Sequence, residues 1–74
     1  MKLKKVTKVK DNIYEIIYVS GFFKTYKSAL VYCWVGDWRF IETGKYIPYS
    51  LCTSLSTIAQ GLKLGESFHT ECSE

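Results

Sequence analysis

The sequence predicts a small α+β domain in which an antiparallel sheet of two hairpins packs against a C-terminal helix. Two pairs of β-rich segments, at residues 3–19 and 38–48, each flank a short turn, and residues 50–64 carry apolar side chains at helical spacing. The expected order of elements is ββ(α)ββα, in which the parentheses mark an ambiguous segment at residues 25–35. Residues 1–65 are expected to form a single domain, followed by a polar C-terminal tail at residues 66–74.

The first hairpin is expected from residues 3–10 and 13–19. The first of these segments mixes apolar residues with lysines, and the second is β-branched and aromatic almost throughout. Asp11 and Asn12 lie between them and form a two-residue turn, although such turns prefer Asn-Gly or Asp-Gly.

Residues 25–35 fit either a helix or a strand. Thr25 is a suitable N-cap, and a set of mainly apolar residues then falls on one helical face: Tyr26, Ala29, Leu30, Cys33 and Trp34. Residues 30–35 are also a continuous apolar run that ends at Gly36 and Asp37, as a buried strand would. The capped helical spacing is the more specific pattern, so it favours the helix, and the strand is the alternative.

The second hairpin is expected from residues 38–42 and 46–48, and the C-terminal helix from residues 50–64. Ser50 can cap this helix and Gly65 can end it, whereas Gly61 inside it costs about 1 kcal/mol relative to Ala. One stripe of the helix is apolar and should pack on the sheet: Leu51, Cys52, Leu55, Ile58, Ala59 and Leu62.

The composition indicates a folded domain that does not enter membranes. Four Phe, six Tyr and two Trp supply a core to a chain of 74 residues, which buries only about 60% of its unfolded surface. No stretch approaches the roughly 18 apolar residues of a membrane span, and no apolar signal segment directly follows the basic N-terminus. Three cysteines, an odd number, favour reduced thiols. We therefore expect a cytoplasmic protein.

The residues that could carry chemistry are scattered. His69 is the single histidine and lies in the predicted polar tail. Together with Cys33, Cys52 and Cys72 it has the ligand types of a zinc site, but only His69 and Cys72 have the close spacing that such sites prefer. Cys33 and Cys52 fall on predicted apolar faces, where a free cysteine packs as a small core residue. We expect no enzyme activity, no bound metal and no cofactor.

Nucleic-acid binding is an alternative that the distribution of charge suggests. Residues 1–27 have a net charge of +5 and residues 28–74 a net charge of −2. In an extended strand, alternate lysines would line one face for phosphate contacts and the next strand would offer rings for stacking, the candidates being Lys2, Lys4, Lys8, Lys10, Tyr14 and Tyr18. The chain has a single arginine, which disfavours base readout, and lysines also protect edge strands from aggregation.

Protein binding is the function that the sequence favours. Twelve aromatic residues exceed what so small a core can hide, and Tyr, Trp and Arg are enriched at interface hot spots. The candidates around the second hairpin are Trp38, Arg39, Tyr46 and Tyr49, with a core position as the alternative for Trp38. We expect an inhibitor or adaptor, a role typical of small proteins encoded by phages or mobile elements. Its partner would be an unidentified protein or a second copy of the chain.

Overall fold

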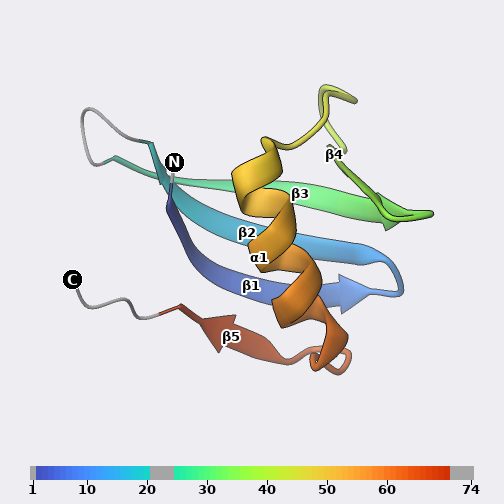
Figure 1. Cartoon of the computed structure of the whole chain (residues 1–74). Coiled ribbons are helices and arrows are strands. Elements are labelled where there is room, and N and C mark those ends of the chain that lie inside the picture. Colours follow the sequence, from blue (N-terminus) through green and yellow to red (C-terminus); the bar gives the residue numbers. More distant parts are fainter. Residues whose placement is uncertain (1, 21–24, 71–74) are drawn as a thin grey trace.

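A computed structural model describes residues 2–20 and 25–70 of the chain. They form one antiparallel sheet of five strands in the order β4-β3-β2-β1-β5, and one helix crosses a single face of it (Figure 1). The fold is α+β, as the sequence predicts. The elements are β1 (Lys2–Lys10), β2 (Ile13–Ser20), β3 (Thr25–Trp34), β4 (Asp37–Phe40), α1 (Tyr49–Gln60) and β5 (Ser67–His69).

Strands β1 and β2 form the predicted first hairpin. Asn12 has a φ of 67°, a left-handed conformation that Asn adopts more readily than most residues, so the turn closes without glycine. The pairing slips by one position between Leu3 and Lys5 and again between Lys8 and Lys10. Each slip interrupts the alternation of side chains along β1, because one residue more on this strand shifts its neighbours to the other face.

The helix predicted at residues 25–35 is wrong, because Thr25–Trp34 is the long strand β3. It pairs with β2 from Ile13 opposite Tyr32 to Ser20 opposite Thr25, and its C-terminal half also pairs with β4. Apolar side chains occupy both faces of this strand, with Ala29, Val31 and Cys33 against the core and Leu30 on the other face. A strand that is apolar on both faces lacks a period of two, so its pattern matches a helical spacing by chance.

The second hairpin is shorter than predicted. Strand β4 ends at Phe40, and the expected return strand is reduced to a single bridge between Arg39 and Tyr46. The N–H of Phe40 donates to the carbonyl of Lys45 at 2.9 Å, and the N–H of Gly44 donates to the carbonyl of Phe40 at 2.8 Å. These two bonds close a tight reversal of the chain directly after β4.

Helix α1 is also shorter than predicted. Pro48 stands at its N-cap position without a side-chain capping bond, so Ser50 lies inside the helix and does not cap it. Gly61 ends the helix, and the chain continues through Leu62, which still packs in the core. The predicted apolar stripe is therefore correct, although its last member lies beyond the helix.

Strand β5 lies within the segment predicted as a polar tail. Ser67, Phe68 and His69 stand opposite Thr7, Val6 and Lys5 of β1, and the hydroxyls of Thr7 and Ser67 are 2.7 Å apart. The helix therefore connects the two edge strands of the sheet, β4 and β5, across its full width (Figure 1).

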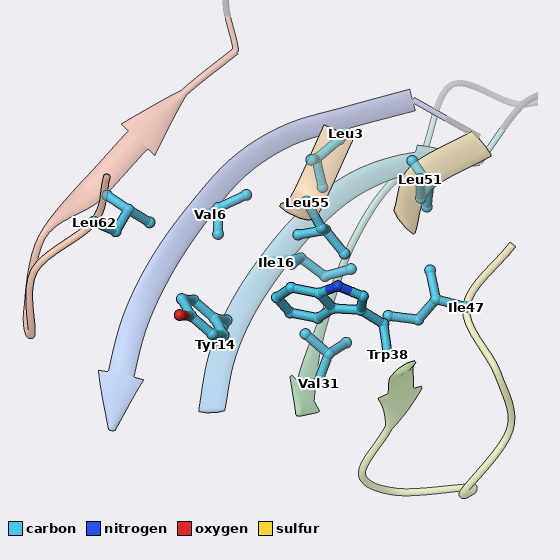
Figure 2. Packing of buried hydrophobic residues seen from close by; sticks show 10 residues of the cluster. All are labelled: Leu3, Val6, Tyr14, Ile16, Val31, Trp38, Ile47, Leu51, Leu55 and Leu62. Atoms are coloured by element: carbon cyan, nitrogen blue, oxygen red, sulfur yellow. The ribbon is translucent and has the colours of Figure 1, made fainter. Parts of the chain in front are cut away.

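The hydrophobic core fills the space between α1 and the sheet, with Trp38 among its central members (Figure 2). The ring of Trp38 lies 5.3 Å from that of Tyr14, measured between centroids, and its Nε1–H donates to Ser56 Oγ at 3.1 Å. Aromatic pairs at this distance add to the stabilisation that burial alone provides. The buried residues are Leu3, Val6, Tyr14, Ile16, Val31, Trp38, Ile47, Leu51, Leu55 and Leu62.

Replacing Leu55 by Ala should lower the free energy of unfolding by about 2–5 kcal/mol, because Leu55 is fully buried and its loss leaves a cavity. Urea unfolding followed by tryptophan fluorescence measures the change. Ser54→Ala is the matched control, since Ser54 is exposed on the same helix and should stay within about 0.5 kcal/mol of the unsubstituted chain. Equal effects of the two substitutions would contradict this packing.

Candidate functional site

Within residues 2–20 and 25–70, one face of the sheet carries no helix (Figure 1). Side chains alternate between the two faces of a strand, so the neighbours of the buried residues Tyr14, Ile16 and Val31 point away from α1. We call this second side the uncovered face. Its apolar members, drawn from β2, β3 and the residue after β4, are Ile13, Ile17, Val19, Tyr26, Leu30, Tyr32, Trp34 and Ile41.

Several of these apolar side chains are largely open to water. Tyr26 is 66% exposed, Trp34 67%, Leu30 46% and Ile41 42%. Leu30 and Ile41 are neighbours, because the N–H of Ile41 donates to the carbonyl of Leu30 at 2.9 Å. Single exposed apolar residues are ordinary, whereas a group of them on one face of a sheet is typical of a surface that contacts another molecule.

Lysines of β1 line one side of this apolar area. Lys2, Lys5 and Lys10 stand opposite Val19, Ile17 and Ile13 and therefore share the uncovered face. Glu15 lies nearer the middle, between Ile13 and Ile17 along β2 and opposite Leu30 of β3. The uncovered face is thus cationic along one side, apolar over β2 and β3, and acidic at one central position.

Arg39 and Tyr46 form a compact pair at the β4 side of the sheet. The guanidinium carbon lies 4.3 Å from the centroid of the Tyr46 ring, and Nη2 donates to the Tyr46 hydroxyl at 2.6 Å. This hydrogen bond, with a smaller Coulombic contribution from the same tyrosine, raises the pKa of Arg39 above its ordinary value. Tyr46 is 61% exposed, so a charged group held over an aromatic ring is presented to solvent.

The structure brings together two of the four residues predicted to bind protein. Arg39 and Tyr46 are in contact, whereas Trp38 is only 3% exposed and belongs to the core. Tyr49 is 85% exposed at the start of α1, in the layer that covers the opposite face. The core position considered for Trp38 is the one observed.

The lysines predicted to bind nucleic acid do not share one face. Lys2 and Lys10 lie on the uncovered face, but Lys8 stands opposite Tyr14 and so shares the covered face. Lys4 falls at the first irregularity of β1. Lys5, which simple alternation places on the other face from Lys2, joins the uncovered face because of that irregularity.

The two tyrosines predicted to stack on bases lie on the covered face. Tyr14 is buried against Trp38, and the Tyr18 ring packs at 6.4 Å from that of Phe40. Neither ring is part of the uncovered face. The rings that β3 contributes to the uncovered face are at residues 26, 32 and 34. These positions are an even number of residues apart, which is the signal that a strand interpretation would have used.

Ligand-type side chains are dispersed over the described residues. No group of three or more His, Cys, Asp and Glu residues is placed to hold a metal ion there. Cys33 and Cys52 are half-buried free thiols, His69 lies on β5 opposite Lys5, and Cys72 lies outside the described residues. Over the same residues, no helix is long and apolar enough to cross a membrane.

The comparisons with known proteins identify no relative. No protein-family model matches the chain, and neither a curated protein nor a solved structure is similar to it. The interpretation of the uncovered face therefore depends on its own geometry.

The thiol of Cys52 should be slow to react at mildly alkaline pH. Burial, with smaller contributions from Asp37 and Cys33, raises its pKa above the ordinary value of 9.0, and Sγ–H donates to the carbonyl of Ile47 at 3.4 Å. The folded state thus favours the protonated thiol. This contribution to stability is complete below pH 9.0 and is lost as the pH rises through the folded-state pKa.

Iodoacetamide alkylation of a Cys33→Ser, Cys72→Ser variant between pH 7 and 11 tests this pKa. The rate should reach half its maximum above pH 9.0 in buffer and return to the ordinary range in urea, because only thiolate reacts. The same midpoint in buffer and urea would show that burial does not shift the pKa.

Proposed function

We propose that this chain is a non-enzymatic protein-binding domain that acts as an inhibitor or adaptor by placing its uncovered face against a partner protein. The observation that carries the proposal is the concentration of exposed apolar side chains, including Tyr26, Leu30 and Trp34, on one face of the sheet. Removing such side chains from water is the main favourable contribution to protein association, at about 25 cal/mol per Å² of apolar surface.

The dimensions of the uncovered face suit a small protein interface. Strand spacing and rise per residue give it roughly 20 Å by 25 Å, or about 500 Å² in projection. A standard interface buries about 800 Å² per partner. The face thus supplies most of such an interface, and the Arg39–Tyr46 pair at its edge supplies the arginine and tyrosine that interface hot spots favour.

Single-stranded nucleic acid is a second candidate ligand, because Lys2, Lys5 and Lys10 run beside exposed rings on the same face. Lysines neutralise phosphates and aromatic rings stack on bases. Glu15 argues against it, since it lies on the same face between Ile13 and Ile17, where its carboxylate would repel a phosphate backbone. A protein partner meets no such conflict, because a basic side chain can pair with Glu15.

Trp34→Ala should weaken partner binding by roughly thirty-fold, or about 2 kcal/mol, if Trp34 is an interface hot spot. Tyr49→Ala is the matched control, because it removes a still more exposed ring, 85% against 67% for Trp34, from the helix layer. The tagged chain is used to retrieve partners from the native cell lysate, and light scattering measures self-association. Equal retention by Trp34→Ala, Tyr49→Ala and the unsubstituted chain, together with an unchanged monomer mass, would overturn the proposal.

Fluorescence anisotropy with labelled 20-nucleotide single strands separates the two candidate ligands. A protein-binding face should give no saturable signal at 50 mM salt. Binding that falls steeply between 50 and 200 mM salt, and that Lys5→Gln weakens, would instead assign the face to nucleic acid.

A further inference from the structure

Strand β3 is longer than the strand that pairs with its outer edge (Figure 1). Its pairing with β4 runs from Trp34 to Val31, and the bond from the Ile41 N–H to the Leu30 carbonyl is the last one on that side. Among residues 2–20 and 25–70, no strand pairs with this edge at positions 26–28. The edge at these positions therefore offers backbone groups to another chain.

The directions of the backbone groups follow from the bonds on either side. Cys33 donates its N–H to Asn12, on the β2 side of β3, whereas the Leu30 carbonyl points to the β4 side. Every second residue of a strand directs its N–H and C=O groups toward the same neighbouring strand, so residues 26 and 28 point the same way as Leu30. Tyr26 and Ser28 consequently direct theirs to the free edge, as two donors and two acceptors.

The chain after β4 turns away and leaves this edge open. The reversal closed by Phe40, Gly44 and Lys45 takes the chain back past Arg39. Gly44 has a φ of 73°, a conformation that favours glycine and that permits the tight turn. Strand β4 is thereby stopped before it can cover the N-terminal half of β3.

Two hollows, each of about 400 Å³, flank the free edge, and residues 28–30 and Glu42 line both of them. One hollow lies toward the covered face and includes the rings of Tyr18 and Phe40. The other lies toward the uncovered face and includes Glu15 and Ile41. Successive side chains of a strand point to opposite faces, so a strand added here would direct alternate side chains into the two hollows.

The two hollows differ in charge. In the hollow of aromatic rings the charge of Lys45 offsets that of Glu42, whereas Glu15 and Glu42 line the other hollow with no cationic residue beside them. Neither carboxylate has an ion-pair partner within the described part of the chain. An apolar side chain thus fits the first hollow and a lysine or arginine fits the second.

We infer that the free edge of β3 at residues 26–28 binds an extended segment of a partner protein in which apolar and basic residues alternate. The segment adds a sixth strand to the sheet, with main-chain hydrogen bonds to Tyr26 and Ser28 and side chains in the two hollows. The inference rests on the proposed function only in taking the ligand to be protein. It does not require that the apolar area around Trp34 also be contacted.

The probe for this inference is the blocked peptide Thr-Leu-Lys-Leu-Lys-Leu-Thr, added to the full ¹⁵N-labelled chain and followed by NMR. Saturable binding should slow hydrogen exchange of the Tyr26 and Ser28 amides at least tenfold, because both become bonded across the new strand pair. The matched peptide Thr-Leu-Glu-Leu-Glu-Leu-Thr should bind at least fivefold more weakly, because its carboxylates meet Glu15 and Glu42.

Two sets of variants separate backbone from side-chain contributions. Ser28→Pro removes the outward N–H and should abolish the protection of Tyr26, whereas Ser28→Ala keeps this N–H, so the protection should persist. Ser54→Ala, on the helix and outside both hollows, should leave binding unchanged. If Ser28→Pro does not fold, the Glu15→Gln, Glu42→Gln double variant takes its place, since it should remove the preference for the lysine peptide while the backbone is unaltered.

The inference is overturned if the lysine peptide does not bind, or if its chemical-shift changes fall on the Trp34 region without protection of Tyr26 and Ser28. Either result leaves the lysate test of Trp34→Ala untouched. Conversely, edge protection together with an unaffected Trp34→Ala variant would support the strand site and refute the role of the uncovered face.

Discussion

The limit on this structure is that one twelve-residue helix must cover a sheet of five strands. A sheet with a helix on one side buries one face and leaves the other to water. The fully buried residues Val6, Ile16, Val31 and Leu55 all lie between α1 and the sheet. Because α1 also connects the two edge strands, the short strands β4 and β5 are held at the margins by the same packing that forms the core.

That one-sided core accounts for the positions of the aromatic candidates on the strands. Trp38 was a reasonable hot-spot candidate by residue type, but its place on β4 turns it inward, and Arg39, one residue later, turns outward. The same alternation removes Tyr14 and Tyr18 from the uncovered face. The type of a residue indicates what its side chain can bind. Its odd or even position along the strand decides which face of the sheet it lies on, and therefore whether it can reach a ligand.

The sequence was sufficient for the fold class, the first hairpin and the apolar stripe of the helix, because each of these has a local pattern with a clear period. It was insufficient for β3, since apolar residues on both faces erase the period of two that identifies a strand. The irregularities of β1 were equally hidden, because their position depends on pairing with β2. Both failures affected the predicted site: Tyr26 and Trp34 were placed on a helical face, and Lys8 was grouped on one face with Lys2 and Lys10 although it lies on the covered face.

The apolar residues on the outer face of β3 are unfavourable in the isolated chain, because Leu30 and Trp34 are exposed to water there. The core does not account for them, since Ala29, Val31 and Cys33 already supply the inward side of the strand. A strand that is apolar on both sides is usual where both sides are covered. The proposed partner would cover the outer residues of β3 and so complete the covering that α1 provides on the other side.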